Sequence, residues 1–154
     1  MERVFGEAAD IAAWMELVRL VRWNFPGLET EASMDEHEQT VLRFMEKKQA
    51  LCVKDQGAII GVLLFSRKRN MICCLAVHPE RRKQGVGSLL LEKALAELDR
   101  TQAITVSTFR ANDAKGTAPR ALYQKFGFKE AEWTEEFGYP LQQFVLSPSI
   151  PVSR

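Results

Sequence analysis

The most informative stretch of the chain is Val77-His78-Pro79-Glu80-Arg81-Arg82-Lys83-Gln84-Gly85-Val86-Gly87-Ser88-Leu89-Leu90. An apolar run, residues 71–77, ends at its start, three cations follow, and two glycines then open an apolar-periodic helix. Glycine lets a backbone come close to a ligand. The free N–H groups and the dipole of a helix N-terminus both favour negative charge there. The stretch therefore predicts a strand, a basic turn and a helix that bind a polyanion between them. An ordinary strand-to-helix turn with solvated charges is the alternative.

Three common anion-binding motifs can be compared with this stretch. The P-loop pattern is absent, and the dinucleotide fingerprint fails because Leu90 stands where its third glycine is needed. The pattern Arg/Gln-x-x-Gly-x-Gly/Ala is matched at every fixed position by residues 82–87. In this it resembles the pyrophosphate-binding turn of the GNAT (Gcn5-related N-acetyltransferase) superfamily, whose members use acetyl-CoA.

A second motif lies about thirty-five residues further on, in Ala121-Leu122-Tyr123-Gln124-Lys125-Phe126-Gly127-Phe128. It is similar to the family's second signature, a short helix that carries a tyrosine and ends at Gly-Phe. Together the motifs make residues 50–130 resemble the family. The resemblance implies an α/β (α+β) fold with a mixed, mostly antiparallel central sheet of six or seven strands, flanked by about four helices.

The composition indicates one domain over residues 1–154. A chain of this length with 46% apolar residues buries about 70% of its unfolded surface. The net charge of +1 gives no global attraction to nucleic acid or to a membrane. A nucleic-acid binder that uses residues 67–69 and 81–83 is disfavoured, because no recognition motif accompanies them.

The three cysteines, Cys52, Cys73 and Cys74, match no metal or redox spacing, so no metal site is expected. An odd number of cysteines and no signal peptide indicate a reducing compartment, the cytoplasm. Buried small apolar side chains are the favoured interpretation of all three. No apolar run reaches the ~20 residues that a membrane span requires.

The hydrophobic pattern predicts a mixed order of strands and helices. Asp10 is expected to cap the first helix, and Ser33 and Glu36 to form a capping box at the second. In the strand 71–77, alternation places Met71, Cys73, Leu75 and Val77 on one face. Strands are expected at 2–6, 51–53, 58–65, 71–77, 104–109, 128–133 and 142–146, and helices at 10–23, 33–48, 85–99 and 119–126.

The resemblance implies acetyl-CoA as the acetyl donor, with CoA as the product. It implies that backbone N–H groups near Gln84 to Ser88 bind the pyrophosphate. It also implies that the strand 71–77 parts from its neighbour and pairs with the pantetheine arm, with one N–H facing the thioester oxygen. Many relatives carry an asparagine seven residues before the tyrosine, where this chain has Gly116; Asn112 is expected to replace it. The expected cofactor-binding residues are Leu75, Ala76, Val77, Arg82, Lys83, Gln84, Gly85, Val86, Gly87, Ser88 and Asn112.

Tyr123 is the predicted catalytic residue. The resemblance places its hydroxyl beside the sulfur, and a phenol pKa of ~10 suits proton donation to a leaving thiolate. A core aromatic packed with Phe126 and Phe128 is the alternative. His78 is interpreted as structural. An acyl-enzyme on Cys73 or Cys74 is disfavoured, because no His/Asp partner is evident. The base stays open between a water chain and four carboxylates, Glu29, Glu31, Glu135 and Glu136.

The predicted function is a cytoplasmic N-acetyltransferase that transfers the acetyl group of acetyl-CoA to a primary amine by direct attack in a ternary complex. The acceptor is a small-molecule or peptide amine, and neither nucleic acid nor membrane is an expected partner. A non-catalytic acyl-CoA-binding or sensing module is the alternative. A homodimer through the C-terminal strands is plausible, because an exposed strand edge invites pairing.

Overall fold

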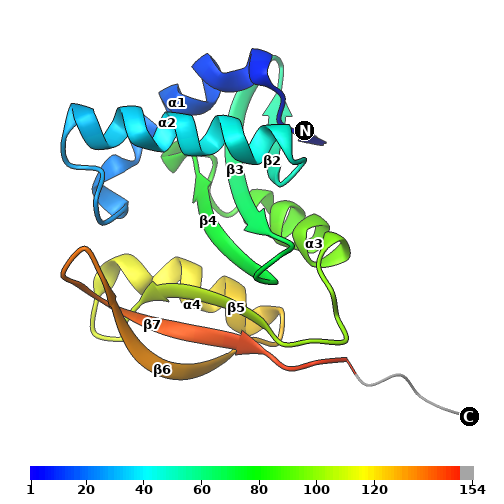
Figure 1. The fold of residues 1–154 in the computed structure, drawn as a ribbon, viewed down its shortest axis with the longest axis vertical. Coiled ribbons are helices and arrows are strands. Elements are labelled where there is room, and N and C mark those ends of the chain that lie inside the picture. The colour runs from blue at the N-terminus through cyan, green and yellow to red at the C-terminus, as the bar shows by residue number, and fades with distance from the viewer. Residues whose placement is uncertain (150–154) are drawn as a thin grey trace, which may run out of the picture.

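Strands and helices follow one another in the computed structural model nearly as the sequence pattern predicts (Figure 1). The structure describes residues 1–149, so the last five residues of the expected domain lie outside it. Four single turns of 3₁₀ helix are η1 (Ala8–Asp10), η2 (Arg22–Asn24), η3 (Pro79–Arg81) and η4 (Ala114–Gly116). The α-helices are α1 (Ile11–Leu20), α2 (Glu31–Glu46), α3 (Val86–Glu97) and α4 (Thr117–Lys125). The strands are β1 (Glu2–Phe5), β2 (Ala50–Asp55), β3 (Ala58–Ser66), β4 (Met71–Val77), β5 (Ile104–Phe109), β6 (Lys129–Glu136) and β7 (Tyr139–Leu146).

The strands form one seven-stranded sheet in the order β1-β2-β3-β4-β5-β7-β6. Every neighbouring pair is antiparallel except β4 and β5, which are parallel. The expected mixed, mostly antiparallel sheet with four flanking helices is confirmed. Within residues 1–149, no helix is long and apolar enough to cross a bilayer.

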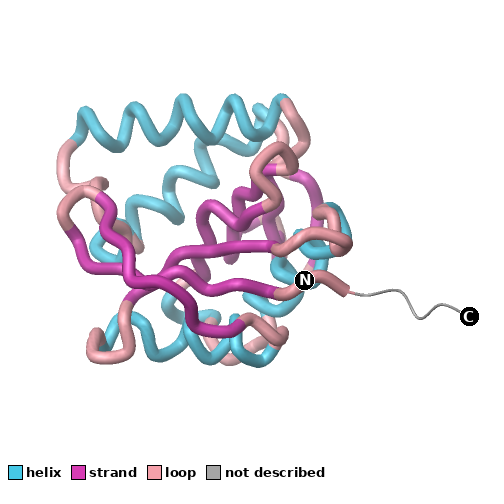
Figure 2. Tube along the Cα trace, turned by 60° about the horizontal axis from the view of Figure 1, so that its bottom comes forward, coloured by secondary structure: helices cyan, strands magenta, loops and turns pink. Residues whose placement is uncertain are grey.

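Helices cover both faces of the sheet, and each face has its own hydrophobic core (Figure 2). On one face α1 and α2 bury Trp14, Met34 and Val41 against β2 and β3. On the other face α3 and α4 bury Leu90, Leu91 and Tyr123 against residues from β2 to β7. Side chains from β3 enter both cores in alternation, as expected for a strand with helices on both sides.

The junction between β4 and β5 is the irregular part of the sheet. The two strands pair only at Met71 and Thr105, and they then diverge, as Figure 1 shows. One edge of β4 beyond Met71 is therefore left without a strand partner. The parting of β4 from its neighbour, which the family resemblance implied, is present.

A bulge in β4 changes which of its side chains share a face. Leu64 on β3 pairs with Cys74, and Phe65 pairs with Ile72, so Cys73 is the extra residue. As a result Ile72 joins Leu75 and Val77 against the α3 core. The expectation that Met71 and Cys73 share the face of Leu75 and Val77 is wrong, because an inserted residue shifts the alternation by one.

Two helix ends also differ from the expectation. The first helix ends at Leu20 rather than near Trp23, and Asp10, although it stands at the N-cap, accepts its hydrogen bond from the N–H of Glu7. The second helix begins after Thr30, whose hydroxyl accepts from the N–H of Ser33 at 3.0 Å. Ser33 is thus the third residue of the helix and not its cap, because Thr30 offers an equally suitable hydroxyl one turn earlier.

Candidate active site

The turn between β4 and α3, residues 82–88, presents a row of unused hydrogen-bond donors. None of its backbone N–H groups donates a hydrogen bond within the described residues, and the first helical bond of α3 runs from the N–H of Leu89 to the carbonyl of Gly85. Gly85 caps the helix in the left-handed conformation, with φ of +81°. A Cβ on Gly85 would meet no atom within 4 Å, so the turn is open to solvent above it. Such an array of N–H groups at a helix start suits an anion.

Of the three cations at positions 81–83, two form no ion pair within residues 1–149 and one does. Arg82 and Lys83 are exposed and form no ion pair within residues 1–149. Arg81 instead pairs with Asp55 of β2 and donates from Nε to the side-chain oxygen of Gln84 at 3.0 Å. His78 accepts the N–H of Glu80 at Nδ1 and so shapes η3, in agreement with a structural role. Arg81 and His78 therefore hold the turn in place, while Arg82 and Lys83 are available to a ligand.

Close packing explains where the turn lies. A Cβ on Gly61 of β3 would stand 2.4 Å from Cγ1 of Val86, and one on Gly87 would stand 3.0 Å from Cδ2 of Leu122. The start of α3 is thus pressed against β3 on one side and α4 on the other. The sequence motif places Gly87 at the expected phosphate-binding turn. In the structure, the absence of a side chain on Gly87 also leaves room for Leu122.

The open edge of β4 lies beside the turn. The N–H of His78 donates to the carbonyl of Ile60 on β3 at 2.8 Å. Because N–H groups alternate in direction along a strand, those of Val77 and Leu75 point away from β3 and into the gap. The buried N–H of Ala76, by the same alternation, faces β3. Leu75 and Val77 thus offer two donors along one line toward the gap.

Tyr123 lies on α4 at the far side of the gap. Its side chain is 4% exposed and packs against Phe128 and Phe144, with ring centroids 5.6 and 6.2 Å away. Burial raises the pKa of its phenol, and the nearby Cys74 thiol of β4 adds to the rise. The hydroxyl has no hydrogen-bond partner in the described residues, yet it is not among the fully enclosed polar atoms. Tyr123 is therefore a core aromatic whose hydroxyl lies near Cys74 of β4 and is not fully enclosed.

The cysteines of β4 do not form a buried pair. Cys52 on β2 is buried as expected, but Cys73 is exposed and Cys74 partly so, because they lie at the bulge beside the gap. Burial nevertheless raises the pKa of the Cys74 thiol to about 12. A thiol that is protonated at neutral pH is a poor nucleophile, which argues further against an acyl-enzyme.

The position of the family's asparagine is sterically closed to a side chain here. Gly116 is buried, and a Cβ on it would stand 3.0 Å from Cβ of Phe109 and 3.2 Å from the carbonyl oxygen of Arg110. Asn112 lies exposed in the same loop, and its side chain makes no hydrogen bond within residues 1–149. Its expected contact with a cofactor stays a prediction.

The four candidate bases are placed very differently. Glu31 receives hydrogen bonds from Arg19 and Arg22, which lower its pKa to about 2 and make it a weak base. Glu135 and Glu136 are exposed on the edge strand β6. Glu29 alone lines a cavity, and its carboxylate accepts only the N–H of Gly27, at 3.2 Å.

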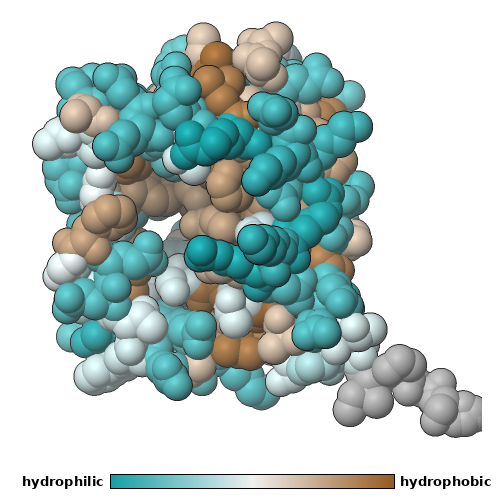
Figure 3. Space-filling view, in the orientation of Figure 1, coloured by the Kyte–Doolittle hydropathy of each residue, from teal (hydrophilic) through white to brown (hydrophobic). Residues whose placement is uncertain are grey.

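That cavity lies at the end of β5 that has parted from β4, because Phe109, the last residue of β5, lines it. It holds about 330 Å³ and lies between the loop after α1, the end of β5 and the start of β7. Figure 3 shows the surface hollowed between the parts of the molecule that carry β4 and β5, with apolar side chains around the hollow. We call it the aromatic cavity. Its lining residues are Arg22, Trp23, Phe25, Pro26, Leu28, Glu29, Phe109, Lys115 and Tyr139.

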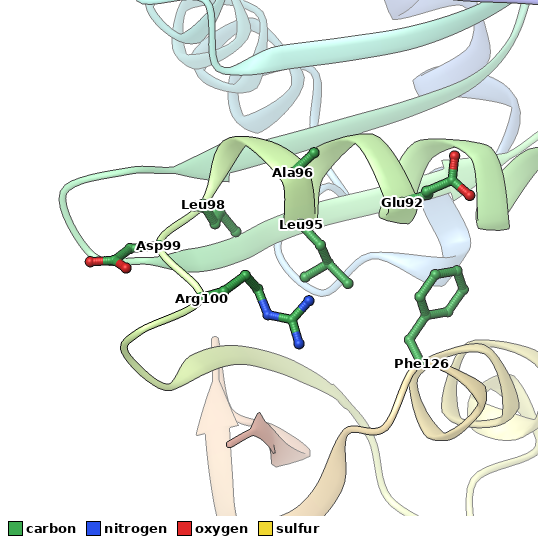
Figure 4. Close-up of a pocket in the computed structure, with 7 residues that line it drawn as sticks. All are labelled: Glu92, Leu95, Ala96, Leu98, Asp99, Arg100 and Phe126. Atoms are coloured by element: carbon green, nitrogen blue, oxygen red, sulfur yellow. The ribbon is translucent and has the colours of Figure 1, made fainter. Parts of the chain in front are cut away.

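A second cavity of about 470 Å³ lies between the C-terminal part of α3 and Phe126 (Figure 4). Arg100 extends into it from the loop after α3, and Glu92 lines it while pairing with Arg3. Asp99, also at its edge, accepts hydrogen bonds from Thr101. None of these groups faces the gap beside β4, so this cavity is not the candidate site.

Sequence reasoning missed the residues that join α4 to the end of β5. Buried Arg120 donates to the carbonyl of Phe109 at 3.0 Å and to Gln142 at 2.8 Å, and it pairs with Glu130. These contacts fix α4, and hence Tyr123, relative to β5. An arginine inside a short predicted helix gave no signal of burial, because arginine is usually exposed.

The mixed sheet that parts between β4 and β5, with helices on both faces, is the architecture of an acetyltransferase fold. Residues 46–130 match the family model described as acetyltransferase (GNAT) domain, and the chain therefore belongs to the GNAT acetyltransferase family.

Solved structures share the fold across nearly the whole chain. A GNAT-family acetyltransferase of Bacillus cereus has a TM-score of 0.72 at 18% identity and covers 97% of this chain and 98% of its own. The protein yncA of Salmonella typhimurium, solved with acetyl-CoA, has a TM-score of 0.74 at 19% identity, with 100% of this chain and 97% of its own covered. The paiA N-acetyltransferase of Thermoplasma acidophilum, solved with coenzyme A, has a TM-score of 0.68 at 16% identity, with 92% and 96% covered.

A curated relative is similar over a shorter region. The UPF0157 protein YqkA of Bacillus subtilis is 31% identical over 81 residues. This match covers 51% of the present chain and only 22% of YqkA.

Proposed function

We propose that this protein transfers the acetyl group of acetyl-CoA to a primary amine, by direct attack within a ternary complex. The observation that carries the proposal is the open edge of β4 where it parts from β5, with the turn 82–88 at its end and Tyr123 near Cys74 of the same strand. Membership of the acetyltransferase family supports the reaction, and acetyl-CoA and CoA in two similar structures support the donor.

The turn 82–88 suits the diphosphate of the donor. Its N–H groups supply several charge-assisted hydrogen bonds, and Arg82 and Lys83 add positive charge at the rim. The helix dipole alone contributes only ~0.3–1 kcal/mol, so the hydrogen bonds provide most of the affinity. Arg81 takes no direct part, because Asp55 already neutralises it.

Residues of the gap then act on the acetyl group. Acetyl-CoA supplies an activated thioester. The N–H groups of Leu75 and Val77 pair with the pantetheine arm, and one of them polarises the carbonyl, an interaction worth ~2.7–4 kcal/mol in comparable sites. Tyr123 holds a proton for the departing sulfur, and its raised pKa keeps the hydroxyl protonated at neutral pH. Glu29 is the best placed of the four carboxylates to draw a proton from the amine, directly or through water.

The test compares wild type with Tyr123→Phe, which removes only the hydroxyl. Acetyl-CoA consumption is measured with a panel of primary amines, and cofactor binding is measured by calorimetry. We expect turnover to fall by about 10²-fold or more with CoA affinity within a factor of two. Tight CoA binding by the wild type without turnover on any amine would instead favour the acyl-CoA-sensing alternative.

A further inference from the structure

The tip of the β6–β7 hairpin carries an aromatic residue in an unfavourable backbone conformation. Glu136 pairs with Tyr139, so Phe137 and Gly138 form a two-residue turn, with φ of +51° and +75°. Such turns favour asparagine followed by glycine, and a bulky side chain at positive φ is uncommon. Phe137 is also 79% exposed, so core packing does not account for it. A strained, exposed aromatic side chain of this kind indicates a functional constraint.

Phe137 contacts the loop that follows α1, although the two are far apart in sequence. Gly27 of that loop has φ of +89°, and a Cβ on it would stand 2.7 Å from Cδ2 of the Phe137 ring. The contact therefore requires glycine at this position. Trp23, four residues earlier, is 75% exposed. Figure 1 shows the loop after α1 and the β6–β7 turn at the same side of the molecule. Trp23 thus lines the aromatic cavity, and Phe137 lies against Gly27, between the lining residues Pro26 and Leu28.

Hydrogen bonds hold these walls in place. Nζ of Lys115 donates to the carbonyl of Trp23 at 3.3 Å and lies 5.4 Å from the ring centre of Tyr139. The Tyr139 hydroxyl donates to Asp113. Three separate segments, the loop after α1, the loop after β5 and the start of β7, are therefore joined around one cavity. Its volume of about 330 Å³ is at the small end of the range for small-molecule sites.

The charges of the cavity limit what it accepts. Glu29 is its one carboxylate, and it forms no ion pair within the described residues. Lys115 places a positive charge on the same walls, where Arg22 is already paired with Glu31. One ammonium can pair with Glu29, whereas a second ammonium on the same ligand would find no other carboxylate in the lining and would meet Lys115.

We propose that the acceptor is a primary monoamine with an aromatic body, held by Trp23 and Phe137 at the mouth of the aromatic cavity and by Glu29 at the ammonium. The proposal rests on the proposed function and names the substrate class of its site. A ring between aromatic walls is stabilised by apolar burial and by edge or stacking contacts. A polyamine has no aromatic body, so it gains neither, and its second ammonium would be repelled by Lys115.

The test uses tryptamine and spermidine as acceptors, with acetyl-CoA saturating. We expect kcat/KM for tryptamine to exceed that for spermidine by at least tenfold. In Phe137→Ala and Trp23→Ala, we expect KM for tryptamine to rise about tenfold with kcat nearly unchanged. Trp133→Ala is the matched control, because Trp133 is 70% exposed on β6 but stacks on Arg110 outside the cavity. It should leave KM within a factor of two. A preference for spermidine, or wild-type KM in both variants, would overturn the proposal.

Calorimetry of tryptamine binding to the CoA-loaded protein separates this proposal from the proposed function. Binding that weakens about tenfold in Phe137→Ala, and also in Glu29→Gln, supports the site even if no acetyl transfer occurs. Glu132→Gln, on the exposed edge strand, is the control for the loss of a carboxylate. Acetyl transfer to other amines without measurable tryptamine binding would reject the aromatic acceptor and leave the transferase function standing.

Discussion

Tyr123 is both a packed residue of the core and the proposed proton donor to the leaving thiolate. Its ring lies among Phe128 and Phe144, and the same burial that stabilises it raises the pKa of its phenol. Considered alone, the raised pKa makes the phenol a weaker proton donor. The environment also raises the pKa of the adjacent Cys74 thiol to about 12, so a thiol leaving in the same place is expected to bind its proton more tightly as well. Proton transfer between the two stays balanced.

The raised pKa of Tyr123 has a consequence for stability at high pH. In the unfolded chain a tyrosine loses its proton near pH 10, whereas the folded chain retains it. Above pH 10 the unfolded state binds fewer protons, so the free energy of unfolding falls as pH rises, by up to ~1.4 kcal/mol per pH unit from this group. We expect urea unfolding of Tyr123→Phe to show a shallower loss of stability above pH 10 than wild type. Equal slopes in the two proteins would mean that the phenol is solvated.

Among single residues, the sequence predicts those whose chemistry is local. Gly85 and Tyr123 stand at fixed places in two motifs: Gly85 takes a left-handed conformation, and Tyr123 packs against Phe128 as its alternative interpretation as a core aromatic expected. The sequence could not predict that Arg81 forms an ion pair while Arg82 does not, because the partner Asp55 is 26 residues away from Arg81 in sequence. The loss of the asparagine at Gly116 is explained only by Phe109 and Arg110, which approach it in space.

Helices and strands were predictable in kind and order, but less so at their ends. The pattern placed β4 correctly at Met71–Val77, because an apolar run bounded by a turn and a proline is distinct. It did not reveal the bulge at Cys73, since an inserted residue leaves composition unchanged. It placed the cap of α2 at Ser33 because Thr30 and Ser33 are chemically alike, and only hydrogen bonding distinguishes them.

The contact of α3 with β3 leads to a prediction at the scale of these elements. In Gly61→Ala the new methyl group would stand 2.4 Å from Cγ1 of Val86 and would displace the start of α3. We expect a loss of about 1–3 kcal/mol in the free energy of unfolding, together with weaker CoA binding. Gly61→Ala combined with Val86→Ala provides the control, because it removes the obstructing methyl groups. It should recover part of the CoA affinity; an equal defect in the single and double variants would contradict the steric explanation.

For the molecule as a whole, the parting of β4 and β5 divides the sheet into two parts that share the core under α3 and α4. The turn 82–88 and the open edge of β4 lie on one side, and Tyr123 and the aromatic cavity adjoin the other. The sequence indicated the first side through its motifs. It gave no indication of the aromatic cavity, because the wall residues 22–29 are far in sequence from the wall residues 109, 115 and 139.

A donor bound across this gap should stabilise the entire fold and protect β4. At 100 times its Kd, acetyl-CoA is expected to add about 2.7 kcal/mol to the free energy of unfolding, which raises Tm by about 5–10 °C for a chain of this size. Hydrogen exchange should slow in residues 84–88 and also in peptides that contain Leu75 and Val77, because their N–H groups gain partners. ADP is the matched ligand, since it carries a diphosphate but no pantetheine, and it should protect the turn while leaving β4 unchanged. Equal protection of β4 by both ligands, or no protection of β4 by acetyl-CoA, would show that the pantetheine arm does not pair with this strand.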